Sequence, residues 1–187
     1  MDHYAAGALN PKDHGRLVAD IDRFAHMVGI HPRWISTPLD PSLLGEQECE
    51  YFSAFRRHKA AGTVHGLCYV GSSASHDVSP RMFAIAGMMT RQYVDAKVMT
   101  LATVLEHLHD RDMPRPECLF IPNFFMSKAQ GGGLQTWQIA ALYDLLLQRA
   151  QLGLQTVLYV ASNKLLANEY GQNFLSLILG HYQLAKV

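Results

Sequence analysis

The fold is decided by residues 66–80, GLCYVGSSASHDVSP. The first five residues are a short apolar run that ends at Gly71, which is typical of a buried strand entering a turn. After Pro80 the sequence predicts a helix over about 82–93, with the proline near its first turn. A turn between a buried strand and a helix is where a phosphate-binding loop sits in α/β proteins, because backbone N–H groups and the helix N-terminus there face an anion.

This turn does not carry the residues that a triphosphate requires. A working phosphate loop has a glycine, four residues, then Gly-Lys-Ser or Gly-Lys-Thr, in which the lysine reaches the phosphates and the hydroxyl holds magnesium. The corresponding positions here are His76, Asp77 and Val78. Asp77 would set a carboxylate against the phosphates, a like-charge contact that is costly in a partly desolvated site. The degenerate nucleotide loop comprises Gly71, Ser75, His76, Asp77 and Val78. Its Ser-His-Asp run is not a catalytic triad, since adjacent residues cannot adopt that geometry.

Strand and helix signals alternate through the rest of the chain. Further strands are predicted at 97–101, 119–121 and 156–161, and helices at 104–109, 135–151 and, as one or two segments, 164–183. Such alternation favours a mostly parallel sheet covered by helices on both faces. We therefore expect a three-layer α/β fold of the P-loop NTPase type.

The N-terminal part of the sequence predicts two helices joined by an extended connector. A helix is predicted over 17–28 with Gly29 as its stop, then an extended connector over the proline-containing residues 30–44, and a second helix over about 45–60. At 187 residues the chain fits one domain. We expect residues 1–60 to form a helical segment and connector packed on a core of residues 61–187.

Composition narrows the class of protein. Sixteen Lys and Arg balance sixteen Asp and Glu, which removes the simple electrostatic argument for non-specific binding to nucleic acid or to an anionic membrane. Three widely spaced cysteines give no paired metal or redox motif. We therefore expect no metal site. The sequence has no signal-peptide pattern and no apolar run long enough to span a membrane, so we expect a cytoplasmic protein.

Four segments together resemble the helicase-loader and transposition-helper branch of the AAA+ ATPases, proteins that help place a replicative helicase on DNA or assist a transposase. Residues 30–34, IHPRW, resemble the motif at the start of that family's core, and residues 66–71 resemble the strand into its phosphate loop. Residues 119–124, LFIPNF, fall where the family's acidic strand end lies, and residues 160–163, VASN, are similar to its polar sensor strand. The resemblance covers residues 30–182.

The resemblance also implies what has been lost. In such ATPases the strand end supplies carboxylates that place magnesium and polarise the attacking water. Pro122 and Asn123 stand there instead, and only Asn163 keeps a sensor-like residue suited to a γ-phosphate. The helical lid of the broader class is expected to be absent. The prediction is a protein that is not an enzyme and uses no cofactor.

Two further groups are candidate contact residues. Arg56, Arg57 and Lys59 form the densest basic cluster, which is either a nucleic-acid contact or a solvated helix end. Phe124 and Phe125 are either exposed partner contacts or buried residues. The leading hypothesis is a non-hydrolysing adaptor or regulator that contacts a helicase, an active ATPase or another DNA-processing complex of replication or of a mobile element, either as a monomer or as an oligomer. The alternatives are a single-stranded nucleic-acid-binding module and an unusual ATP-dependent helicase loader.

Overall fold

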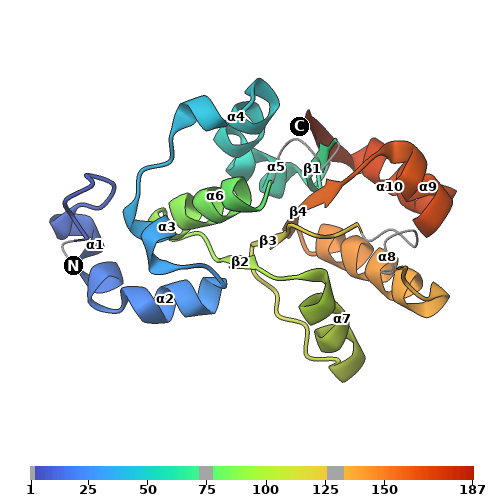
Figure 1. The fold of residues 1–187 in the computed structure, drawn as a ribbon, viewed down its shortest axis with the longest axis horizontal. Helices are drawn as coiled ribbons and strands as arrows, with labels where there is room; N and C mark the ends of the chain where they lie inside the picture. The colour runs from blue at the N-terminus through green and yellow to red at the C-terminus, as the bar shows by residue number, and fades with distance from the viewer. Residues whose placement is uncertain (1–2, 72–77, 126–132) are drawn as a thin grey trace.

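The computed structural model describes residues 3–71, 78–125 and 133–187 and forms a three-layer α/β domain (Figure 1). The described residues contain a five-stranded sheet with the order β2-β3-β4-β1-β5. Its strands are β1 (Gly66–Val70), β2 (Ala96–Val98), β3 (Cys118–Ile121), β4 (Gln155–Val160) and β5 (Tyr182–Lys186). All four ladders are parallel. The predicted fold class is confirmed.

Helices cover both faces of the sheet (Figure 1). The helices are α1 (Pro11–Ala19), α2 (Ile21–Val28), α3 (Pro32–Ser36), α4 (Glu46–Ser53), α5 (Phe55–Ala61), α6 (Ser79–Arg91), α7 (Leu101–Asp110), α8 (Thr136–Gln151), α9 (Asn163–Tyr170) and α10 (Gln172–His181), with a 3-10 turn η1 (Pro41–Leu43). The helices α4, α5 and α6 pack on one face, and α7 to α10 pack on the other. None of the described helices is long and apolar enough to cross a membrane.

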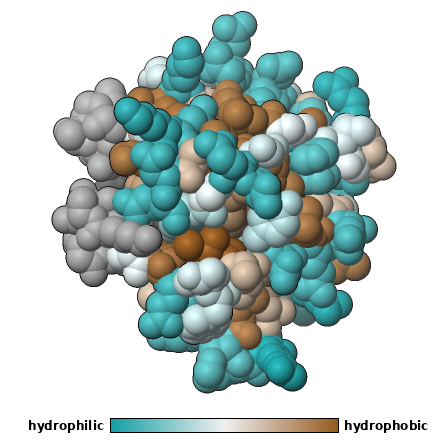
Figure 2. All heavy atoms as spheres, turned by 90° about the vertical axis from the view of Figure 1, so that its right-hand side faces the viewer, coloured by the Kyte–Doolittle hydropathy of each residue, from teal (hydrophilic) through white to brown (hydrophobic). Residues whose placement is uncertain are grey.

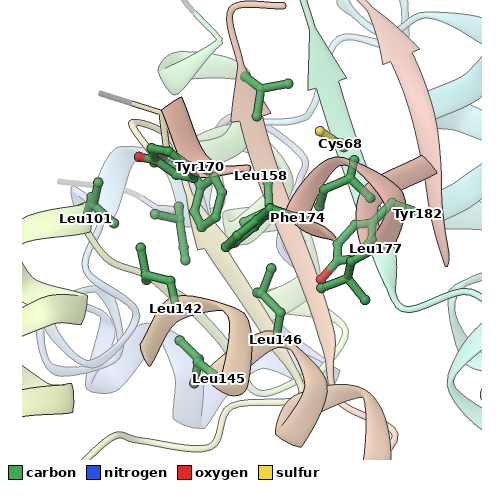
Figure 3. Packing of buried hydrophobic residues seen from close by; sticks show 14 of the residues in the cluster. Cys68, Leu101, Leu142, Leu145, Leu146, Leu158, Tyr170, Phe174, Leu177 and Tyr182 are labelled. Atoms are coloured by element: carbon green, nitrogen blue, oxygen red, sulfur yellow. The ribbon is translucent and has the colours of Figure 1, made fainter. Parts of the chain in front are cut away.

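The core on the α7–α10 side is built around β4. Figure 3 shows side chains of α8 and α10, among them Leu146, Phe174 and Leu177, converging on Leu158. Leu158 and Leu146 are almost fully buried. Burying one such side chain stabilises a fold by about 1.5–3 kcal/mol, so this cluster is a main source of stability.

The opposite face buries the alternate residues of the same strands. Cys68 packs with the α7–α10 cluster, whereas its neighbours Leu67 and Tyr69 pack against α4 and α6, as the two-residue period of a strand requires. A buried carboxylate is satisfied here: Glu48 accepts hydrogen bonds from the Tyr69 hydroxyl at 2.6 Å and from Arg81 at 3.0 Å. Burial, followed by the charge of Glu48, raises the pKa of Tyr69, which keeps its hydroxyl protonated as the donor.

The helices α1, α2 and α3 have a small core of their own that includes Leu17, Ile21 and Ile35. The α3 helix is attached to α6 by Arg91, whose Nη1 donates to the backbone carbonyls of Ile35 and Thr37 at 2.8 and 3.0 Å. These are carbonyls at the end of α3, where a cation is favourable. The attachment fixes residues 30–36 beside α6.

Three expected helical or extended segments differ from the structure. Residues 30–44 are not simply extended, because Pro32 opens the short helix α3, a position where its missing N–H costs nothing. The helix expected over 17–28 is two helices that meet at Asp20, and the helix expected over 45–60 breaks at Ala54. These breaks let the N-terminal helices turn around the core.

The expected helix over 164–183 also ends early. The α10 helix stops at His181, and Tyr182 begins β5, a parallel strand that pairs with β1 over its whole length. The strand expected over 97–101 is likewise shorter, since Leu101 is the first residue of α7. The interpretation of 182–183 as helix was therefore wrong.

Candidate functional site

Three neighbouring strands end at one edge of the sheet. Because β3, β4 and β1 are adjacent and parallel, their carboxyl ends meet, which is the usual ligand position in open α/β sheets. This edge brings together Gly71 after β1, Asn123 after β3 and Asn163 after β4. The Gly71 amide donates to the Val160 carbonyl at 3.2 Å. Three of the predicted site residues thus share one end of the sheet.

Gly71 has a packing reason for being glycine. The Tyr159 hydroxyl donates to its carbonyl at 2.8 Å, and a Cβ on Gly71 would lie 1.9 Å from the Val187 carbonyl oxygen. No side chain fits in that space. The glycine is therefore required by the close approach of the chain after β5, whether or not a phosphate binds.

The loop itself lies outside the described residues, and with it Ser75, His76 and Asp77. Val78, at the other end of the loop, is 4% exposed and packs with the apolar cluster between α6 and the sheet. A buried valine has no oxygen with which to hold magnesium. The position that the sequence aligns with the hydroxyl of working phosphate loops is therefore part of the core.

The end of β3 is occupied by a structural contact. The Asn123 side-chain oxygen accepts a hydrogen bond from the Leu101 amide at 2.9 Å, and Leu101 is the first residue of α7. The bond satisfies one of the amides that a helix N-terminus leaves free. Asn123 therefore couples the end of β3 to the start of α7.

Asn123→Ala is expected to lower the free energy of unfolding by about 1 kcal/mol, because the Leu101 amide loses its acceptor. Asn123→Asp keeps an acceptor and adds negative charge at a helix N-terminus, so its stability is expected to equal or exceed that of the unchanged protein. Urea unfolding of the three proteins measures both effects. Equal losses in the two variants would contradict the assigned contact.

Asn163 is the first residue of α9, which Ser162 caps by accepting from the Leu165 amide at 3.1 Å. The Asn163 side-chain oxygen is buried and has no hydrogen-bond partner among the described residues. Buried polar atoms are normally paired, so this oxygen is a side-chain group at the strand ends for which the described residues provide no structural use.

A cavity of about 550 Å³ adjoins this edge, between residues 26–34 and the first two turns of α6. It is lined by His26, Gly29, Ile30, His31, Arg33, Trp34, Pro80 and Phe83. The Arg33 guanidinium lies over the Trp34 ring, 4.7 Å from its centroid, and Trp34 contacts Phe83 with ring centroids 6.1 Å apart. Cationic and aromatic groups of this kind suit a planar or anionic ligand. The sequence indicated a motif at residues 30–34, but no pattern in it predicted that these residues line a cavity.

Phe124 does not fit the predicted partner contact. It is fully buried, it packs against Tyr170 and Phe174, and its carbonyl accepts from the Tyr170 hydroxyl at 2.9 Å. Phe125 is partly buried against the same cluster. Burial, the alternative that the sequence left open, therefore holds for Phe124, and the aromatic residues that cover it belong to α9 and α10.

The basic cluster of Arg56, Arg57 and Lys59 lies near the amino ends of the strands. Lys59 forms an ion pair with Glu117, which directly precedes β3, while Arg56 and Arg57 are exposed on α5. The amino ends of the strands are on this side, opposite to Gly71 and Asn163. The cluster therefore cannot act on the same ligand as the strand-end residues. Within the described part of the chain, no three His, Cys, Asp or Glu residues gather as a metal site would require.

No protein-family model matches the sequence, and no curated protein is significantly similar to it. Solved structures are similar in fold. A DNA replication initiation factor aligns with TM-score 0.55 and 10% identity, covering 77% of this chain and 47% of that one. Replication initiator DnaA bound to AMPPCP and single-stranded DNA aligns with TM-score 0.54 and 12% identity, with the same coverage of 77% and 47%.

The DnaC helicase loader aligns over a larger share of both chains, with TM-score 0.55, 12% identity, and coverage of 88% of this chain and 98% of that one. The chain spans about half the length of the first two structures. Identities this low show a common α/β fold and nothing about chemistry.

Proposed function

We propose that this protein is a non-hydrolysing, AAA+-like adaptor or regulator that acts by protein contact in a DNA replication or mobile-element assembly. The observation that carries the proposal is the end of β3, where Pro122 and Asn123 stand and Asn123 is engaged by the start of α7. Hydrolysis of a nucleoside triphosphate needs groups that place magnesium and orient the attacking water. A proline and an amide held by a helix supply neither.

The residues expected to surround a bound phosphate also support the proposal that the protein does not hydrolyse nucleotide. Val78 is buried where a magnesium-binding hydroxyl would be needed. Asn163 retains an unpaired amide oxygen, but one amide replaces neither a lysine nor a metal site. A chain that keeps the fold and lacks these groups is suited to contact partners rather than to turn over nucleotide.

The replication context rests on the fold neighbours, whose names describe replication initiation and helicase loading. A protein-contact role is supported by apolar side chains on the outer helices. Trp137 on α8, Leu165 on α9 and Leu179 on α10 are 50%, 39% and 49% exposed. Figure 2, which views the molecule from the side of α8 to α10, shows hydrophobic patches between hydrophilic groups. Exposed aromatic and aliphatic groups are common anchors of protein interfaces.

The test combines turnover and binding. The purified protein is mixed with the replicative helicase of the cells from which it comes, with and without nuclease treatment, and either without nucleotide or with magnesium and ATP or ADP. We expect a complex whose affinity changes less than twofold with nucleotide, and no ATP hydrolysis above background. An active helicase-loader ATPase serves as the positive control for turnover.

Two outcomes would replace the proposal. Magnesium-dependent ATP hydrolysis that Asn163→Ala abolishes would identify an unusual active loader. Binding that disappears with nuclease, and that Arg56→Gln and Arg57→Gln weaken in a salt-dependent way, would identify a nucleic-acid-binding module.

A further inference from the structure

Another cavity lies near the amino ends of the strands, opposite to the end of the sheet where Gly71, Asn123 and Asn163 lie. It has a volume of about 280 Å³ and is enclosed by the end of α7, by residues 111–115 and by the second half of α8. Its wall includes Leu154, which directly precedes β4. Because these segments lead into the amino ends of β3 and β4, the cavity is separate from Gly71, Asn123 and Asn163.

Positive charge is concentrated in this cavity. Its lining includes the arginines Arg111, Arg115 and Arg149 together with His107 and Gln148, and no carboxylate belongs to it. Within residues 3–71, 78–125 and 133–187, the side chains of Arg111 and Arg115 form no hydrogen bond or ion pair. The exposed acid Asp112 binds His107 Nδ1 at 2.7 Å, and Asp95, which is not part of the lining, favours the charged form of Arg149 through its own charge.

Arg149 fixes one of these charges inside the protein. It is 2% exposed, its Nε donates to Thr156 Oγ1 at 2.9 Å, and its Nη2 donates to the carbonyls of Pro116 and Gln155 at 3.1 and 2.7 Å. Its Nη1 has no hydrogen-bond partner in the described part of the chain. Burial lowers the pKa of Arg149 to about 10, which still leaves the guanidinium charged at neutral pH. A buried charge without an ion-pair partner is costly, and a nearby anion would reduce that cost.

The backbone conformation of Arg111 is a further feature of the cavity wall. Arg111 ends α7 in the left-handed conformation, with φ 59° and ψ 30°. Glycine is favoured in this conformation, because a side chain there costs about 1–2 kcal/mol. An arginine at this position is not what the backbone prefers, although its charge is favourable at the end of a helix. Its side chain lines the cavity.

We propose that this cavity binds an oxyanion, a phosphate or a carboxylate, carried by a small, partly apolar molecule. Guanidinium groups present paired donors that match the oxygens of both anions. The rest of the wall is apolar, with Leu108, Met113, Leu145 and Leu152 among its residues. These side chains give an apolar part of the ligand a surface to cover, as in most small-molecule sites.

The test is calorimetric titration of the full chain, in a chloride buffer, with phenyl phosphate, benzoate and inorganic phosphate. We expect saturable binding of phenyl phosphate or benzoate, the tighter of the two identifying the anion, and at least tenfold weaker binding of inorganic phosphate. Arg115→Gln is expected to weaken the preferred probe about tenfold, the equivalent of about 1.4 kcal/mol. Arg23→Gln removes an exposed arginine on α2 outside the cavity and is expected to change the affinity less than twofold.

Arg111→Gly separates binding from folding. Glycine suits the left-handed backbone, so the melting temperature is expected to stay equal or rise while the affinity falls about tenfold. Absence of saturable binding of both organic probes at 10 mM, on the order of the weakest specific binding worth assigning, would overturn the proposal. So would full affinity in Arg111→Gly and Arg115→Gln, or equal affinity for inorganic phosphate. None of these results bears on the adaptor role, which uses other surfaces.

Discussion

Gly87→Ala is expected to lower the free energy of unfolding by about 3 kcal/mol, the upper range for overpacking a core. Gly87 lies in the middle of α6, where α3 crosses it, and a Cβ there would lie 2.1 Å from the carbonyl oxygen of Trp34 and 2.5 Å from its carbon. These are backbone atoms held by Arg91, so they cannot move aside as a flexible side chain can. The substitution must push α3 away from α6.

The matched control is Gly15→Ala in α1, another glycine within a helix. A Cβ at Gly15 meets nothing within 4 Å, so alanine is expected to raise stability by about 0.5–1 kcal/mol through its higher helix propensity. Urea unfolding of both variants gives the comparison. If Gly87→Ala were as stable as Gly15→Ala, the close approach of α3 to α6 would be wrong. Loss of the α3 position should also disturb the cavity lined by Arg33 and Trp34.

Arg149→Met is expected to cost about 3 kcal/mol of unfolding free energy. Methionine fills a similar volume and removes the cost of burying a charge, which by itself would favour the variant. Against this, three acceptors lose their donors at once: Thr156 Oγ1 and the carbonyls of Pro116 and Gln155. Each buried group left unpaired costs about 1–3 kcal/mol, so the losses exceed the gain.

Chemical unfolding again measures the effect, with Arg57→Met as the control because Arg57 is exposed on α5. The control is expected to change stability by less than about 0.5 kcal/mol. Arg149→Lys keeps a charge but cannot span the three acceptors, so it should not restore the stability of the unchanged protein. A variant Arg149→Met more stable than the parent would mean that the unpaired charge outweighs its hydrogen bonds.

The alternation of strands and helices could be predicted from the sequence because buried parallel strands and amphipathic helices leave different patterns. Residues 66–70 and 135–151 were placed to within a residue or two. The strand β5 was missed because no glycine or proline separates it from α10. Its five residues are too few for the two-residue period of a strand to be distinguished from the period of the preceding helix. The helix α3 was missed because Pro32, which disrupts a helix interior, here opens one.

The strand-end site could be predicted in its position but not in its contacts. The family resemblance assigned Gly71, Asn123 and Asn163 to one nucleotide site, and the parallel strands, which share their direction, bring these residues to one end of the sheet. That Asn123 is held by Leu101, and that Phe124 is buried, depends on how α7 and α9 pack, which no local pattern reports. Buried Arg149 did leave a signal, because Leu142, Leu145 and Leu146 precede it at the spacing of one helix face.

The position of β5 beside β1 also bears on how the chain is made. The residues of β1 leave the ribosome early, whereas Tyr182, which pairs with Gly66, is synthesised only after β4, α9 and α10. Until then the edge of β1 that β5 will cover has open hydrogen-bonding groups, and unpaired strand edges are where nascent chains associate wrongly. Completion of the sheet therefore depends on a late segment, and translation that stops before Tyr182 would release a chain prone to aggregation.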